Sequence, residues 1–151
     1  MKAHTEHKAW SGEFEAPEVP RLMGFGEAPQ APLAMEEAIA SGLPKEALQR
    51  VARAISSDPV EANKLVHAVV PKSSLSRRGT LTPAQGEQTE RLARLFAYAT
   101  HVMGSAEDAR EFMHRPHPEL NNRRPVDAAL NELGGRAVER VLDSLAYGLP
   151  V

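Results

Sequence analysis

The sequence has no cysteine, few aromatic residues and no long apolar run. Without cysteine the chain cannot form a disulfide framework, a thiolate metal site or a cysteine nucleophile. Aromatic residues make up only 5% of the 151 residues, and β-branched residues show no sustained alternation, which argues against a strand-rich fold. No apolar stretch approaches the ~20 residues of a membrane span, and the start of the chain lacks the apolar core of a secretory signal. We therefore expect a cytoplasmic protein with no membrane contact.

Sequence patterns of common enzyme classes are missing as well. There is no glycine-rich phosphate loop and no G-x-S-x-G motif. His114 and His117 form an H-x-x-H pair, but Pro116 lies between them and no carboxylate stands at a spacing that would complete a metal site. We expect no catalytic residue, no metal and no cofactor.

Charge is unevenly distributed along the chain. The formal net charge is -2, yet residues 43–80 contain seven lysines and arginines against three acidic residues, a local excess of +4. A compact basic segment in a mildly acidic protein is typical of a surface that attracts nucleic acid. A solvated helix surface would give the same excess, so charge alone leaves both interpretations open.

Residues 1–32 differ in composition from the rest of the chain. They contain four prolines and several glutamates and show no helical period. Such a segment buries too little apolar surface to offset the entropy lost on ordering, so we predict a flexible tail over residues 1–32. Its isolated apolar side chains, which could dock on a partner or on the folded body, are Trp10, Phe14, Leu22, Met23 and Phe25.

From Leu33 onward, apolar residues recur at helical spacing and are interrupted by proline and glycine. Thr82 and Gln85 have the spacing of a capping box in front of the longest predicted helix, which Gly104 ends. We predict an all-α fold, with a helix-turn-helix-like bundle over residues 33–80 and a small helical domain over residues 81–151. The predicted helices cover residues 33–41, 44–55, 59–70, 72–78, 83–103, 106–115, 125–133 and 135–147, with Gly134-Gly135 as a C-terminal cap.

Three short predicted helices between Lys45 and Arg78 have the order of a helix-turn-helix motif, whose recognition helix enters the major groove of DNA. Residues 72–78 would be that helix, because serine hydroxyls and arginines can bond phosphates and base edges. Any small three-helix bundle has the same order, so that alternative stays open. The candidate DNA-contact residues are Lys64, Lys72, Ser73, Ser74, Ser76, Arg77 and Arg78.

Several motifs occur in an order typical of one family. Gly42-Leu43-Pro44 opens the series, and an Arg-Arg pair, "LTPAQGEQTERLARL" and "VMGSAEDAREFM" follow. Toward the C-terminus the chain continues with Phe112-Met113, Pro116-His117, Leu120-Asn121-Asn122, Pro125, Asn131-Glu132-Leu133-Gly134 and Tyr147-Gly148. Over residues 40–151 the chain resembles the Xre/MbcA/ParS antitoxins. Asn121-Asn122 replaces glycines of the family pattern, and asparagine is the residue other than glycine best suited to a positive φ.

The resemblance implies a specific activity. Such antitoxins neutralise a RES-domain toxin encoded beside them, which degrades NAD⁺ or transfers ADP-ribose from it. They bind the toxin directly, with their C-terminal end at its active-site opening. We therefore expect residues 115–151 to form a fixed platform, with residues 147–151 as a C-terminal plug. The candidate toxin-contact residues are Asn121, Asn122, Arg123, Arg136, Arg140, Asp143, Tyr147, Gly148, Leu149, Pro150 and Val151.

Two other classes of protein remain open at this stage. The first is a helix-turn-helix transcriptional regulator without a toxin partner, and the second is an adaptor whose helices only scaffold an assembly. For an antitoxin we expect a RES-domain toxin and operator DNA as partners, and a homodimer or a larger complex with the toxin.

Overall fold

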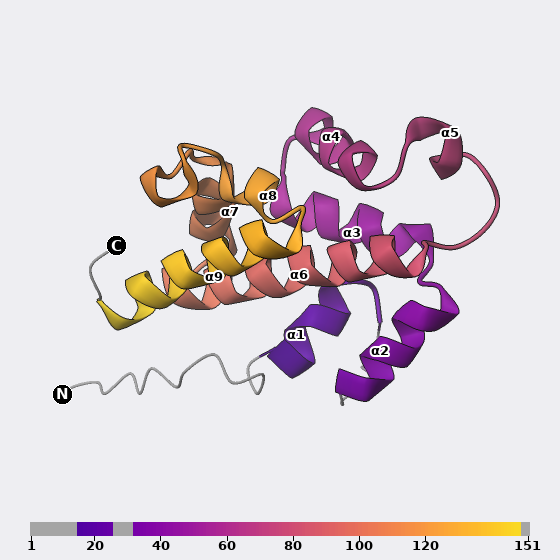
Figure 1. Cartoon of the computed structure of the whole chain (residues 1–151), viewed down its shortest axis with the longest axis horizontal. Coiled ribbons are helices and arrows are strands. Elements are labelled where there is room, and N and C mark those ends of the chain that lie inside the picture. The colour runs from indigo at the N-terminus through magenta and orange to yellow at the C-terminus, as the bar shows by residue number, and fades with distance from the viewer. Residues whose placement is uncertain (1–14, 26–31, 149–151) are drawn as a thin grey trace.

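One long helix runs through the centre of the molecule in the computed structural model, which describes residues 15–25 and 32–148 (Figure 1). This helix, α6 (Pro83–Met103), has 21 residues and is therefore about 31 Å long. The helices α1 (Glu15–Leu22), α3 (Lys45–Ile55), α7 (Ala106–His114) and α9 (Glu132–Tyr147) pack against it. The described residues contain no strand, which confirms the predicted all-α fold.

The remaining elements are shorter and complete the covering of α6 and α3. α2 (Pro32–Ser41) packs on α6, and α4 (Pro59–Val69) packs mainly on α3. α5 (Lys72–Leu75), the 3-10 helix η1 (Pro118–Leu120) and α8 (Pro125–Ala128) are single turns. The apolar core is continuous across these helices, with Leu48, Leu92 and Leu142 fully buried.

The helix ends follow the residues that the sequence places there. The Thr82 hydroxyl accepts from the Gln85 backbone N–H at 3.1 Å, and the Gln85 side chain accepts from the Thr82 N–H at 3.0 Å. This reciprocal pair satisfies two of the N–H groups that a helix start leaves free, and it confirms the predicted capping box. At the other end Gly104 adopts φ +89°, the left-handed conformation of a helix stop.

The prediction of a flexible tail over residues 1–32 is wrong for residues 15–25. There α1 forms and packs on α6 and α3, and Val19 and Met23 are buried to 3% and 2% exposure. Val19, Leu22 and Met23 lie at spacings of three and four, so they share one face of the helix. That short face is enough to dock the segment despite Pro20. Residues 1–14, with Trp10 and Phe14, and residues 26–31 lie outside the described part.

Residues 125–147 differ from the prediction in where α8 ends and where α9 begins. The helix predicted over residues 125–133 ends at Ala128, and Leu133 is 75% exposed instead of buried. Gly134-Gly135 is not a C-terminal cap but lies inside the first turn of α9, where the Asn131 side chain accepts from the Gly134 N–H at 2.8 Å. A Cβ on Gly134 would lie 1.8 Å from the Ala128 carbonyl oxygen, so glycine is required for this close approach.

Polar contacts join the first half of the chain to the second. Arg110 Nε donates to the Ala54 carbonyl at 2.8 Å, and the Arg124 guanidinium pairs with Glu61 at 3.2 Å. His114 binds the Arg110 carbonyl through Nδ1 and the Ser56 hydroxyl through Nε2, both at 2.8 Å. A carbonyl only accepts, so in the neutral ring Nδ1 carries the proton and Nε2 accepts from Ser56.

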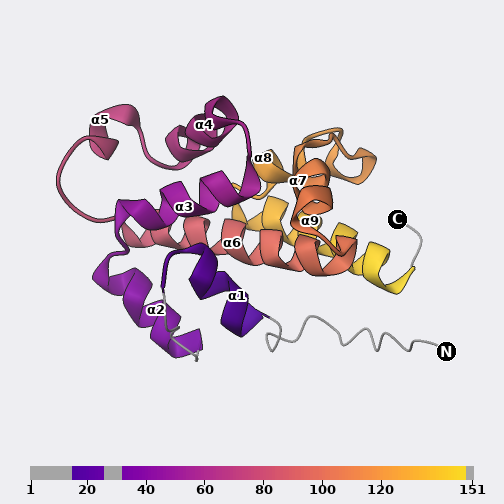
Figure 2. The same cartoon turned by 180° about the vertical axis from the view of Figure 1, so that it is seen from behind.

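Both views of the fold place two exposed features far apart (Figures 1 and 2). The α5 turn projects from one end of the long dimension, and the C-terminal end of α9 lies at the other end. The segment from α5 to Gly79 and the C-terminal end of α9 therefore lie at opposite ends of the molecule.

Candidate functional site

The basic segment predicted to contact DNA is exposed but only partly helical. The helix predicted over residues 72–78 ends at Leu75, and residues 76–79 form turns closed by Gly79 at φ +132°. α5 has no buried residue and no side-chain cap at Pro71, so little within it favours a longer helix. The segment predicted to be the recognition helix is thus one helical turn followed by an irregular basic loop.

The structure groups most of the predicted DNA-contact residues and separates one from them. Ser74 is half-buried, and the others in the segment are exposed: Lys72, Ser73, Ser76, Arg77 and Arg78. Lys64 instead lies on the side of α4 that borders α8, where it pairs with Glu61 at 3.5 Å. The predicted DNA-contact residues within 72–78 are therefore grouped and mostly exposed, and Lys64 lies apart from them.

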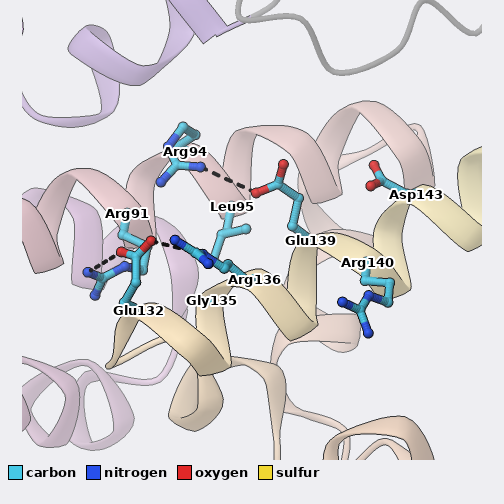
Figure 3. Close-up of a pocket in the computed structure, with 9 residues that line it drawn as sticks. All are labelled: Arg91, Arg94, Leu95, Glu132, Gly135, Arg136, Glu139, Arg140 and Asp143. Carbon is cyan, nitrogen blue, oxygen red and sulfur yellow. Dashed lines mark hydrogen bonds and ion pairs between the residues drawn. The ribbon is translucent and has the colours of Figure 1, made fainter.

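A charged groove of about 370 Å³ lies between α6 and α9 (Figure 3). It brings together three of the predicted toxin-contact residues, namely Arg136, Arg140 and Asp143. The residues that line it are Arg91, Arg94, Leu95, Glu132, Gly135, Arg136, Glu139, Arg140 and Asp143.

Carboxylates and guanidinium groups alternate across this groove. Glu132 pairs with Arg136 at 3.2 Å and with Arg91 at 3.3 Å, and the hydrogen bond from Arg136 and the charge of Arg91 lower the pKa of Glu132. Glu139 pairs with Arg94 at 3.6 Å, but burial raises its pKa above the ordinary value. In Figure 3 the Arg140 side chain points away from the carboxylates of Glu139 and Asp143.

Asp143 is tied to the core at the far end of the groove. It accepts a 2.5 Å hydrogen bond from the hydroxyl of Tyr98, a buried residue of α6. Burial of the ring, together with the hydrogen bond and charge of Asp143, raises the pKa of the Tyr98 phenol. Asp143 therefore connects α6 to α9 in addition to any contact with a partner.

The outer face of α9 presents a stripe of exposed side chains. Leu133, Arg136, Arg140 and Tyr147 recur at spacings of three, four and seven, so they lie on one side of the helix. Leu133 is 75% exposed and Tyr147 37% exposed, although both are large hydrophobic residues. We call these four residues the α9 stripe. Exposed apolar and arginine side chains on one rigid face are typical of a protein-binding surface.

The turn at residues 121–123 is exposed and lies apart from the groove. Asn121 and Asn122 have φ values of +56° and +60°, which confirms the positive φ expected for residues that replace glycine. Together with Arg123 they follow η1, and none of the three lines the groove. Their rigid conformation makes this turn a second, separate candidate contact.

The C-terminal plug is only partly described. Tyr147 ends α9, and Gly148 adopts φ +64° as its C-terminal cap. Leu149, Pro150 and Val151 lie outside the described residues. The plug therefore stays a prediction beyond Gly148.

Arg91 and Arg94 are groove residues that the sequence analysis missed. They come from α6, about 40 positions before their acidic partners on α9, so no local pattern joins them. A weak signal was present, because the two arginines stand three residues apart, each directly before a buried leucine (Leu92 and Leu95), and so share the polar face of their helix.

Metal binding and membrane insertion find no support in the described residues. Residues 15–25 and 32–148 contain no group of three histidine, cysteine or acidic side chains placed to hold a metal ion. His114 instead accepts from the Ser56 hydroxyl, and His117 accepts from the Glu119 N–H. In the same residues, every helix is too short or too polar to cross a bilayer.

Two protein-family models match the chain, one on each half. The antitoxin Xre-like helix-turn-helix domain matches residues 34–96, and the antitoxin Xre/MbcA/ParS C-terminal toxin-binding domain matches residues 98–148. No curated protein sequence matches the chain. The first match covers the basic α5 segment. The second covers most residues of the groove between α6 and α9 and all of the α9 stripe. The chain therefore belongs to the Xre family of antitoxins, with a helix-turn-helix domain followed by a toxin-binding domain.

Proposed function

We propose that this antitoxin neutralises a RES-domain toxin that consumes NAD⁺ and is encoded beside it. The observation that carries the proposal is the α9 stripe, which lies within the part matched by the toxin-binding domain. Its exposed leucine and tyrosine supply apolar area, and Arg136 and Arg140 supply guanidinium groups for carboxylates on the partner. The chain acts in this account by binding and carries out no catalysis.

The C-terminal plug covers the active-site opening of the toxin in this proposal. Tyr147 stands at the last turn of α9, and Gly148 ends the helix in the left-handed conformation. A rigid helix end is suited to entering a partner's pocket because little conformational entropy is lost on binding. Residues 121–123 and the α9 groove then form the surrounding contact.

A second part of the proposal concerns DNA. The loop after α5 carries Arg77 and Arg78 in the half matched by the helix-turn-helix domain, at the opposite end of the molecule from the C-terminal end of α9. The antitoxin can thus bind its operator and its toxin at the same time and repress its own operon, in the cytoplasm. A homodimer, or a larger complex with the toxin, would place two such loops on one operator.

The competing function is transcriptional regulation without a toxin, which the exposed Arg77-Arg78 loop favours. Co-expression with the neighbouring gene product, followed by purification on a tag placed on the toxin, distinguishes the two. We expect the antitoxin to co-purify in a fixed ratio and the complex to bind promoter DNA. Promoter binding by the free chain without co-purification would support the regulator instead.

A further inference from the structure

Lys45 reaches across the helix-turn-helix domain to the segment that follows α5. It is the first residue of α3, yet its Nζ donates to the backbone carbonyl oxygens of Ser74, Leu75 and Arg77. An ammonium group has three N–H donors, and three carbonyl oxygens lie within its reach. These contacts span about 30 positions of sequence and hold the backbone directly before Arg78.

The carbonyls that Lys45 binds belong to an element with little stability of its own. A helix end leaves its last carbonyls without intrahelical partners, and a single turn has the highest proportion of such groups. α5 has four residues and none is buried. A cation at the C-terminal end of a helix also interacts favourably with its dipole. Lys45 thus supplies hydrogen bonds that stabilise α5, which has few stabilising contacts of its own.

The residues just before Lys45 hold the other end of the same loop. The Leu81 N–H donates to the Leu43 carbonyl at 2.8 Å, and Pro44 forms an isolated β-bridge with Thr80. Gly42 has φ +101°, and a Cβ there would lie 2.3 Å from Oγ1 of Thr80. Residues 42–45 therefore hold the loop on both sides, while residues 76–79 stay exposed.

We propose that Lys45 is a positioning residue for operator binding: it fixes the loop that carries Arg77 and Arg78 without itself contacting DNA. This inference rests on the proposed operator binding by residues 72–78. Fixing the loop before DNA arrives lowers the entropy lost on binding, which raises affinity without a new contact. The C-terminal end of α9, where we propose that the toxin binds, lies at the other end of the molecule, so toxin binding there should not depend on Lys45 (Figure 1).

The test compares Lys45→Met with Lys45→Arg and with Arg115→Met in the full chain. Methionine keeps the length of the side chain but cannot donate, whereas arginine can still donate to carbonyls. Arg115→Met removes one positive charge from an exposed site in the other domain, where the arginine pairs with Glu111. It therefore controls for the change in net charge.

Amide hydrogen exchange of the free protein and promoter affinity are the two readouts. We expect Lys45→Met to speed exchange at residues 76–80 and to weaken promoter binding by about tenfold, equal to ~1.4 kcal/mol. Exchange in α6 and α9 and toxin neutralisation should stay at the parent level, which also shows that the variant is folded. Lys45→Arg should restore most of the affinity, and Arg115→Met should change neither readout.

Two results would overturn the inference. If Lys45→Met weakens promoter binding but leaves exchange at residues 76–80 unchanged, Lys45 contacts DNA directly. If both readouts match the parent, the loop does not depend on Lys45. The double variant Arg77→Ala/Arg78→Ala tests the proposed function separately. If it binds promoter DNA as tightly as the parent, the proposal that this loop binds the operator is wrong, whatever the Lys45 variants show.

Discussion

The hydroxyl of Tyr98 donates a 2.5 Å hydrogen bond to the carboxylate of Asp143 and so joins the central helix α6 to α9. Tyr98 is buried in α6, while Asp143 lines the groove on α9. Asp143 was predicted from the sequence to contact the toxin, but this bond gives it a structural task as well. Loss of function on its substitution would therefore have two possible causes.

Replacing Tyr98 with phenylalanine separates these causes, because it removes the bond and leaves every charge in the groove. We expect Tyr98→Phe to lower the free energy of unfolding by about 1.5–3 kcal/mol, the size of a hydrogen bond to a charged group. Denaturant unfolding measures this, and toxin binding should weaken little. Equal loss of toxin affinity in Tyr98→Phe and Asp143→Ala would mean that Asp143 acts only through the position of α9.

Two glutamates of the same groove should respond to pH with opposite signs. Burial raises the pKa of Glu139, so its ionisation costs stability, which is lost as the pH rises through that raised pKa. Arg136 and Arg91 lower the pKa of Glu132, so its ionised form adds stability that is lost as the pH falls through the lowered value.

At neutral pH, Glu139→Gln should therefore unfold at higher denaturant concentration than the parent, and Glu132→Gln at lower. The Glu139 difference should shrink as the pH falls through its raised pKa toward 4.5, and the Glu132 difference should shrink only once the pH falls below 4.5. Unfolding curves between about pH 3 and 8 check this pair, with each variant serving as the other's control. If the denaturant midpoints of both variants shift in the same direction from that of the parent, the environments assigned to Glu139 and Glu132 are wrong.

The two glycines at the start of α9 should differ sharply in their tolerance of alanine. A Cβ on Gly134 would lie 1.8 Å from a backbone carbonyl, whereas a Cβ on Gly135 would meet only the Arg91 side chain, at 2.7 Å. We expect Gly134→Ala to destabilise the fold by about 3 kcal/mol, because backbone cannot move aside. Gly135→Ala should stay within about 1 kcal/mol of the parent, since alanine favours helix and the arginine can shift. Thermal unfolding of both variants decides this, and equal losses would contradict the packing of α8 on α9.

Arg77 and Arg78 should contribute to promoter binding by neutralising phosphates. For each phosphate that the protein no longer neutralises, the slope of log affinity against log salt should become shallower by about 0.9 on duplex DNA. Promoter titrations of Arg77→Ala/Arg78→Ala at several salt concentrations measure the slope, with Arg115→Met as the charge control. A double variant that matches the parent at every salt concentration would remove the loop from the DNA interface. Toxin neutralisation should be unaffected in Arg77→Ala/Arg78→Ala.

Local sequence patterns predicted the features that depend on a few neighbouring residues. The capping box at Thr82, the helix stop at Gly104 and the positive φ values of Asn121 and Asn122 agree with the structure. Each of these is set by side-chain hydrogen bonds or backbone sterics within about four residues, so the sequence alone contains the information.

Features that depend on distant partners could not be read from the sequence. The docking of Val19 and Met23 requires the surface of α6, and the groove pairs arginines and glutamates that are about 40 residues apart. The sequence suggested a helix end at Gly134. Glycine is required there because the Ala128 carbonyl lies too close for a Cβ, and that contact forms only when α8 packs on α9. In the same way, nothing near Lys45 in the sequence indicates the carbonyls that it binds.

The NAD⁺ content of cells that co-express the neighbouring toxin tests the central claim most directly. The parent antitoxin should keep NAD⁺ at the level of cells without toxin, and so should Arg77→Ala/Arg78→Ala. Arg136→Ala/Arg140→Ala, and Tyr147→Ala with residues 149–151 deleted, should let NAD⁺ fall while melting close to the parent. A buried interface aromatic contributes ~2 kcal/mol, so the loss of Tyr147 alone should weaken the complex roughly 30-fold. Full protection of NAD⁺ by both C-terminal variants at low expression would contradict neutralisation through the α9 stripe and the plug.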